Sequence, residues 1–312
     1  MPGERVLFLF IDGVGLAAAS PANPLATLST PHLRALLGGP LTLEAVAERP
    51  GFLLSAIDAG LGVPGKPQSA TGQTALFTGK NGAVLLGHHA TAFPGPQLRA
   101  LLAEHSIFRR AGDAGRSVTF ANPFTAAYWQ ALEEGRRKAS ASTLAFRAAG
   151  VPFRDLDDLR RGEAVTWDVR RDLFARAADP TLAVVSDAEA GADLARLGGS
   201  NDLTLYETFL TDLAGHDRFG LTVPDAVERV DGLLGGVLAA RPSDVTVVLT
   251  SDHGNIEDSS HRVHTTNPVP LLVVGRAAPA FAGVRSILEV GTAILEVLGI
   301  PGETQPSRSM SS

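Results

Sequence analysis

The sequence has no cysteine among its 312 residues. This absence excludes disulfides, thiolate zinc sites, iron–sulfur clusters and cysteine nucleophiles, and it fits a reducing compartment. Long apolar runs are absent too, because the early run Val6–Ile11 is closed by Asp12. A transmembrane helix needs about 20 apolar residues, and a signal peptide needs a longer run with a cleavage site. We therefore expect a cytoplasmic protein with no membrane partner.

Positive charge is also in short supply. Lysine and arginine total 27 against 33 acids, so the net charge is −6, and charged residues make up only 19%. An acidic chain of this kind is not a general nucleic-acid binder. Apolar residues make up 45%, which excludes disorder and is ample for a packed core. The length suggests two domains or one large domain.

Short β-branched or aromatic runs alternate with helical stretches along the chain. Helical periodicity predicts helices over Pro224–Ala240 and Ser286–Leu298. Nearly continuous apolar runs are typical of parallel strands covered on both faces. The alternation predicts a layered α/β fold around a mostly parallel central sheet. The runs that predict strands are Val6–Ile11, Ser117–Ala121, Leu182–Val185, Leu203–Leu210, Val245–Thr250 and Pro270–Val274.

The middle of the chain differs from its flanks. Over residues 124–180 strand signals fade and arginines gather. This stretch is either a small insertion or lid over the sheet edge, or a helical excursion with ordinary surface charge. We expect residues 1–123 and 181–302 to form the core and the polar end, 303–312, to be a flexible tail.

Acids and histidines gather at three predicted strand ends. Asp212 and His216 are four residues apart just after one strand, Asp252 and His253 are adjacent after another, and His264 precedes a third. Loops at strand ends are where an open α/β sheet builds its sites. One such pair alone is usually a turn with a surface histidine. Three together predict a site for a divalent cation such as Mn²⁺ or Zn²⁺.

Two further segments become candidates for the same site once this cluster is considered. Asp12 stands at the tip of the first strand and is followed by Gly13, although Asp-Gly is also an ordinary turn. Ser69 lies at or just before a predicted helix that includes Thr74–Thr78, where the helix dipole favours an anion. Its alternative role is a plain N-cap. The nearby Gly60–Lys66 is not a P-loop, because Pro67 replaces the required hydroxyl.

In this order, the motifs resemble the alkaline phosphatase superfamily, and most closely its cofactor-independent phosphoglycerate mutases and phosphopentomutases. The resemblance implies an α/β/α sandwich with two metal sites. It places Ser69 as the nucleophile, with Thr71 in reserve. One metal site would be held by Asp12, Ser69, Asp252 and His253, and the other by Asp212, His216 and His264.

The resemblance further implies phosphoryl transfer through a phosphoserine intermediate on a small phosphorylated substrate. The mutases carry a much larger cap than residues 124–180, so we expect a phosphomonoesterase, with a phosphoglycerate- or phosphopentose-type mutase as the alternative. The sulfatase motif is missing around Ser69, and the phosphodiesterase branch stays open. Candidate substrate contacts are Lys80, Arg136, Arg137 and Lys138, since cationic groups suit phosphate.

Two other interpretations remain at this stage. The protein could be a non-catalytic binding protein stabilised by its metals, or the motifs could be accidental. Chelation and elemental analysis distinguish these cases. The sequence fixes neither the natural substrate, the native metal nor the oligomeric state.

Overall fold

A computed structural model describes residues 3–302, and the predicted tail 303–312 lies outside them. The centre is one seven-stranded sheet with the order β2-β3-β7-β6-β1-β5-β4. In chain order the strands are β1 (Arg5–Ile11), β2 (Ala47–Arg49), β3 (Phe52–Ile57), β4 (Val118–Phe120), β5 (Leu203–Thr208), β6 (Val245–Thr250) and β7 (Val269–Val274).

The sheet is mostly parallel, as predicted. Strands β4, β5, β1 and β6 are parallel neighbours. Strand β7 is antiparallel to β6, and β3 is antiparallel to β7, so β3 points the same way as β6. Five of the seven strands therefore share one direction, while β2 and β7 oppose it. The β2–β3 hairpin at one edge was not predicted from the sequence.

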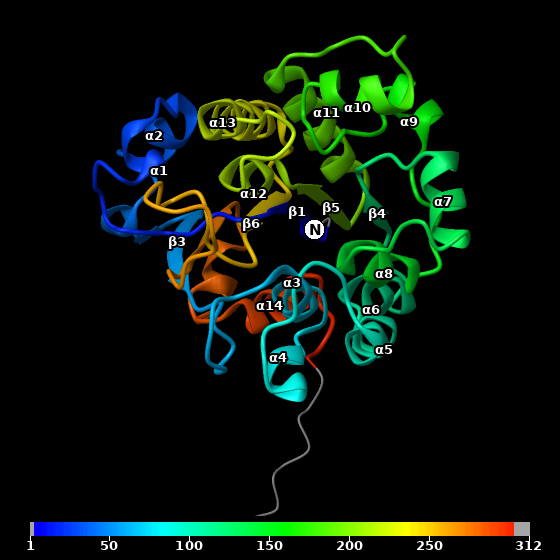
Figure 1. Ribbon diagram of the computed structural model, residues 1–312, viewed down its shortest axis with the longest axis horizontal. Coiled ribbons are helices and arrows are strands. Elements are labelled where there is room, and N and C mark those ends of the chain that lie inside the picture. Colours follow the sequence, from blue (N-terminus) through cyan, green and yellow to red (C-terminus); the bar gives the residue numbers. More distant parts are fainter. Residues whose placement is uncertain (1–2, 303–312) are drawn as a thin grey trace, which may run out of the picture.

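Helices cover both faces of the sheet, which confirms the α/β/α sandwich (Figure 1). Helices α2, α11 and α13 lie on one face, and α3, α5, α6, α8 and α14 lie on the other. The α-helices are α1 (Pro24–Thr27), α2 (Pro31–Leu37), α3 (Ser69–Thr78), α4 (Gly82–Leu86), α5 (Pro96–His105), α6 (Ile107–Asp113), α7 (Ala126–Glu133), α8 (Ala141–Arg147), α9 (Leu156–Arg160), α10 (Asp172–Ala178), α11 (Asp187–Ser200), α12 (Leu210–Gly215), α13 (Val223–Ala240) and α14 (Ile287–Val297). Two 3₁₀ turns, Leu43–Ala45 and Ala278–Phe281, complete the described elements.

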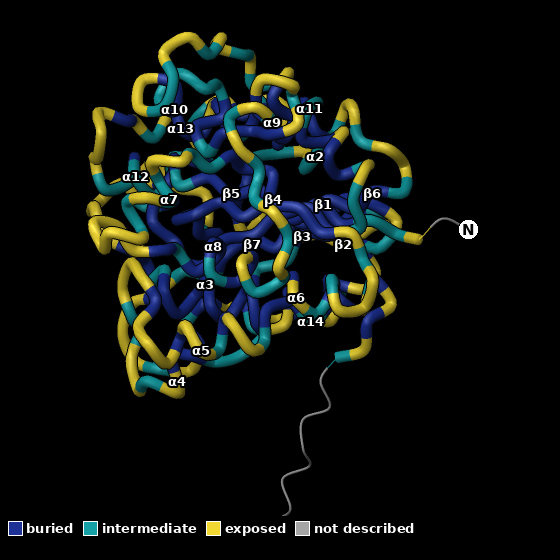
Figure 2. Tube along the Cα trace, turned by 90° about the vertical axis from the view of Figure 1, so that its right-hand side faces the viewer, coloured by how far each residue is buried: buried dark blue, intermediate teal, exposed yellow. Residues whose placement is uncertain are grey.

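Strand β1 shows why the core has two halves. Its residues alternate between the faces, as a strand requires. Phe8 and Phe10 pack with the α3 and α14 side, whereas Leu7 and Leu9 pack with the α11 and α13 side. The sheet is consequently buried on both faces (Figure 2). This burial holds the carboxyl ends of the central strands in fixed positions.

Most predicted elements are present, with two differences. The predicted helices correspond to α13 and α14, and Ser286 caps α14 with a capping box. Leu182–Val185 is not a strand: Val184 is 63% exposed, and Leu182 packs against a small separate cluster of Leu159, Ala164 and Phe174. The predicted strand to Leu210 ends at Thr208, where the chain turns into α12.

The predicted insertion 124–180 contains the short helices α7–α10 beside the β4 edge (Figure 1). It is tied to the core on both faces, since Phe146 joins one core cluster and Val165 the other. Its role as a lid stays a prediction. Among residues 3–302, no helix combines the length and the apolar character needed to cross a bilayer.

Candidate metal centre

Three neighbouring parallel strands bring the predicted ligands to one edge of the sheet. Asp12 directly follows β1, and Asp252 follows β6 after one intervening residue. Asp212 lies in α12, which follows β5 after one intervening residue. Because β6, β1 and β5 are adjacent and parallel, their carboxyl ends meet at a single edge. Residues from three distant parts of the chain therefore converge, as the sequence predicts.

The first cluster joins two carboxylates, one imidazole and one hydroxyl. His253 Nε2 lies 3.3 Å from Asp12 Oδ1 and 3.6 Å from Asp252 Oδ2. Ser69 Oγ lies 3.1 Å from the same nitrogen. Asp252 and His253 are fully buried. The three acid and imidazole groups have ligand atoms within 4.8 Å of one another, which is close enough to hold one ion.

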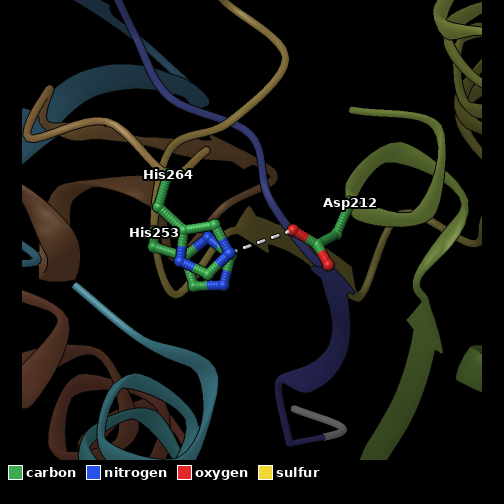
Figure 3. A group of neighbouring side chains, drawn as sticks. All are labelled: Asp212, His253 and His264. Carbon is green, nitrogen blue, oxygen red and sulfur yellow. Dashed lines mark ion pairs between the residues drawn. The ribbon is translucent and has the colours of Figure 1, made fainter. Parts of the chain in front are cut away.

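The second cluster centres on Asp212 (Figure 3). Its Oδ1 lies 3.4 Å from His264 Nε2 and 3.3 Å from His216 Nε2. The rings of His253 and His264 are stacked, with centroids 3.7 Å apart. Asp212, His253 and His264 also have ligand atoms within 4.8 Å of one another. His253 therefore lies between the two clusters, whereas the sequence assigned it to the first alone.

Hydrogen bonds around the second cluster prepare its histidines to bind a cation. His264 Nδ1 donates to the carbonyl of Pro67 at 2.9 Å, and His216 Nδ1 donates to the carbonyl of Arg262 at 3.0 Å. Each bond occupies Nδ1 and turns Nε2 toward Asp212, which is the arrangement of metal-ligating histidines. The two Nε2 atoms are 3.1 Å apart and face Asp212. A divalent cation could take the place of the protons through which these two rings bond to Asp212 in the metal-free protein.

The electrostatics of the first cluster also favour a bound cation. Burial, together with Asp252 and Asp212, raises the pKa of Asp12 well above its ordinary value. Burial also raises the pKa of Asp252 and lowers that of His253. Asp12 Oδ1 and Asp252 Oδ1 are buried and have no hydrogen-bond partner within the described part of the chain, residues 3–302. Buried, mutually repelling carboxylates with unsatisfied oxygens fit a divalent cation.

The pKa of Asp212 is shifted in the opposite direction from those of Asp12 and Asp252. Burial alone would raise its pKa, but hydrogen bonds from His216 and His264 outweigh burial and lower it. Burial likewise opposes the raised pKa of His264, which results from its hydrogen bond to Asp212. Asn255 Nδ2 donates to Asp212 Oδ1 at 2.8 Å. Asp212 is therefore held as a carboxylate, the form that binds metal.

Ser69 lies beside the first cluster at the start of helix α3. Ser69 is its first residue, and Gln68 provides no side-chain cap, so the first N–H groups of the helix are available to an anion. Gln73, one turn later, donates to Asp12 Oδ2 at 3.4 Å and to Asp252 Oδ2 at 3.1 Å. The reserve nucleophile Thr71 instead donates to the carbonyl of Gln68 at 3.1 Å. The structure thus brings Ser69, and not Thr71, to the clusters.

Two glycines allow these segments to approach closely. A Cβ on Gly72 of α3 would lie 2.7 Å from the carbonyl oxygen of Asp252. A Cβ on Gly13 would lie 2.8 Å from Asp212 Cβ, and Gly13 has φ +73°, which favours glycine. Any side chain at either position would push the ligand segments apart.

The predicted substrate contacts are not brought to the clusters. Lys80 follows the opposite end of α3 from Ser69, roughly 14 Å along the helix at 1.5 Å per residue. Arg136 forms an exposed ion pair with Glu134. Arg137 lies over the ring of Tyr128, 5.4 Å from its centroid, and Lys138 is exposed. Arg136, Arg137 and Lys138 follow α7 in the insertion, and sequence periodicity could not predict where the insertion lies relative to the clusters.

Sequence reasoning missed several polar residues around the clusters. Gln73, Asn255 and Glu257 all contact ligands or the segments that carry them. Glu207, on β5, is buried and influences the pKa of Asp12. The only signal for Asn255 and Glu257 was their closeness to Asp252 in the sequence, and Gln73 and Glu207 gave none. His261 forms an ion pair with Asp258 at 3.5 Å, outside both clusters.

Comparison with known proteins agrees with this geometry. Residues 185–301 match the family model described as the metalloenzyme superfamily. The chain is 33% identical over 113 residues to the 2,3-bisphosphoglycerate-independent phosphoglycerate mutase of Cereibacter sphaeroides, covering 34% of this chain and 22% of that protein. It is 29% identical over 146 residues to the phosphopentomutase of Hahella chejuensis, covering 45% and 34% of the two chains. The matches therefore span only about a fifth to a third of these relatives.

The similarity in fold extends over nearly the whole chain. The alkaline phosphatase of the Antarctic bacterium TAB5 superposes with a TM-score of 0.54 at 16% identity, covering 96% of this chain and all of the other. The PH0037 protein of Pyrococcus horikoshii gives a TM-score of 0.56 at 13% identity, covering 98% and 100%. At these identities the comparison shows the fold alone.

Proposed function

We propose a function from one premise: residues 185–301 of this chain belong to the metalloenzyme superfamily, and the chain has the fold of alkaline phosphatases. From this premise, the protein is a metal-dependent phosphoryl-transfer enzyme. It acts on a small phosphate ester with Ser69 as the nucleophile. The observation that carries this proposal is the position of Ser69 Oγ, 3.1 Å from His253 Nε2, against a cluster built to hold a cation.

The ligand sets follow from the two clusters. Asp12, Asp252, His253 and Ser69 would hold one divalent ion, with Asp212, His216 and His264 holding the other. Carboxylate and imidazole donors suit Mn²⁺ or Zn²⁺. When bound, such ions would neutralise phosphoryl oxygens and lower the pKa of the serine hydroxyl.

The chain itself supplies the nucleophile and part of the anion site. Ser69 Oγ would release its proton to solvent and form a bond to phosphorus while the bond to the ester oxygen breaks, and the leaving oxygen takes a proton from solvent. The uncapped N–H groups at the start of α3 would stabilise negative charge on the phosphoryl group. Transfer of the phosphoryl group from Ser69 then regenerates the free hydroxyl.

The acceptor in that second step separates two activities. Transfer to water makes a phosphomonoesterase, which we favour because the insertion 124–180 is anchored in the core by Phe146 and Val165 and adds no large cap. Transfer to a second hydroxyl of the substrate makes a phosphomutase. The mutase names of the relatives support this alternative about equally.

The test compares wild type with Ser69→Ala on a panel of phosphomonoesters with added Mn²⁺. We expect the variant to lose about 10³-fold or more in kcat, since the nucleophile is gone. Thr71→Val is the matched control, a buried hydroxyl loss two residues away, and it should retain activity. Equal turnover by Ser69→Ala and wild type would refute the nucleophile. Labelled phosphate then distinguishes release into water from transfer within a sugar or glycerate phosphate.

A further inference from the structure

Glu257 is a buried carboxylate that contacts three separate loops. Its Oε2 accepts hydrogen bonds from Gly15 N at 2.9 Å and Asn255 N at 2.8 Å. Its Oε1 accepts from Asn267 Nδ2 at 3.0 Å and from the hydroxyl of Thr265. The residue is 1% exposed. All the acceptor capacity of this carboxylate is therefore used inside the protein.

Each of these loops carries a predicted metal ligand. Gly15 is three residues after Asp12, Asn255 is two residues after His253, and Thr265 directly follows His264. One side chain thus connects the β1 loop, the β6 loop and the segment that leads into β7. The backbone reinforces the same junction, because Thr265 N donates to Gly254 O at 3.0 Å and Ile256 N donates to Gly13 O at 3.2 Å.

The junction is specific for a carboxylate. Burying its charge is tolerable only because four donors converge on it. A glutamine of the same shape would direct an NH₂ group at donors that need an acceptor. The space is also closed, since a Cβ on Gly15 or Gly254 would lie 2.1 Å or 2.3 Å from Glu257 Oε1. Neither loop can shift toward the carboxylate to compensate.

We propose that Glu257 is a positioning residue that holds the ligand loops of both metal sites in register, so that the two sites form together. The inference rests on the metal centre of the proposed function. It sets Glu257 apart from a direct ligand, because loss of a ligand weakens the site to which it belongs. Loss of Glu257 releases the loops of Asp12, His253 and His264 together and weakens both sites.

The test titrates Mn²⁺ into the metal-free 312-residue chain. Calorimetry follows the binding, and electron paramagnetic resonance detects paired Mn²⁺ ions. For Glu257→Gln we expect binding at both sites to weaken by about 10- to 100-fold and the spin-coupled signal to be lost. Thr265→Val removes a single donor and should show a smaller loss at both sites, which Thr265→Ser rescues. Asp258→Asn is the matched control, an acid on the same loop that makes none of these contacts, and it should bind as wild type does.

Several results would overturn the inference. Wild-type affinities and coupling in both Glu257→Gln and Thr265→Val would show that Glu257 does not position the ligands. A lowered unfolding temperature of the metal-free variants with an unchanged isotherm would show a purely structural role. If Glu257→Gln does not fold, the comparison of Thr265→Val with Thr265→Ser decides the outcome. If wild type binds two ions and the variants bind them equally well, this inference alone is refuted. If wild type binds no ion, the proposed metal centre is refuted as well.

Discussion

Glu207 should make the metal-free protein lose stability as the pH rises. The residue lies on β5, is 3% exposed, and its Oε2 has no hydrogen-bond partner among residues 3–302. Burial, with a further contribution from Asp252, raises its pKa from 4.5 to about 7, although a hydrogen bond with Ser142 opposes the shift. The folded chain therefore keeps a proton on Glu207 at pH values where the unfolded chain releases it.

The sign and size of the effect follow from this difference. A group whose pKa is raised on folding stabilises the protein fully below its unfolded pKa, and this stability is lost as the pH rises through the folded pKa. One pKa unit corresponds to about 1.36 kcal/mol. For Glu207, the shift from 4.5 to about 7 makes the free energy of unfolding fall by roughly 2.5 kcal/mol between about pH 5 and pH 8.

Glu207→Gln removes this titration while keeping the side-chain shape. Urea unfolding in the presence of a chelator at both pH values gives the free energy of unfolding. Asp12 and Asp252 contribute to the pH dependence of both proteins, so the difference between wild type and variant reports Glu207 together with its electrostatic coupling to these two acids. We expect the decrease from pH 5 to pH 8 to be roughly 2.5 kcal/mol smaller in the variant. The exposed Glu133→Gln serves as control. An identical pH dependence in Glu207→Gln and wild type would refute the electrostatic reasoning.

Other predictions address the close approach of α3, the insertion and the metals. Gly72→Ala should lower stability by about 1–3 kcal/mol and weaken Mn²⁺ binding, because the added methyl group collides with Asp252; unchanged unfolding and binding would show that the segments can move apart freely. Phe146→Ala should cost about 3–5 kcal/mol in urea unfolding, whereas Lys138→Ala should stay within about 0.5 kcal/mol; a small loss for Phe146→Ala would mean that the insertion is not part of the core. Chelation should lower the unfolding temperature and added Mn²⁺ should restore it. At a free Mn²⁺ concentration of a hundred times Kd, each occupied site should add about 2.7 kcal/mol to the free energy of unfolding. An unfolding temperature insensitive to both treatments would argue against a metal-stabilised fold.

The sequence predicts the site better than it predicts the edges of the fold. Asp12, Asp212 and Asp252 are signalled by their positions at strand ends, and the rule that neighbouring parallel strands converge at one edge is enough to bring them together. The position of His253 between the clusters depends on its stacking with His264, which side-chain packing decides and spacing does not. Glu257 was missed for a similar reason, since its partners come from loops far apart in the chain.

The errors at the sheet edges have a different cause. Leu182–Val185 has the composition of a strand, but Leu182 packs against the separate cluster of Leu159, Ala164 and Phe174, and the segment pairs with no strand of the sheet among residues 3–302. The β2–β3 hairpin begins with Ala47–Arg49, which is exposed and carries no apolar alternation. Lys80 was a candidate substrate contact because it follows the helix that begins near Ser69, and that helix separates the two residues. Local pattern alone does not contain these three-dimensional constraints.

The central claim is that two cations bind around one serine hydroxyl. Anomalous diffraction from crystals grown with Mn²⁺ tests it most directly. The account predicts two peaks per chain, one among Asp12, Ser69, Asp252 and His253 and the other among Asp212, His216 and His264. A single peak, no peak, or peaks away from Ser69 would contradict it.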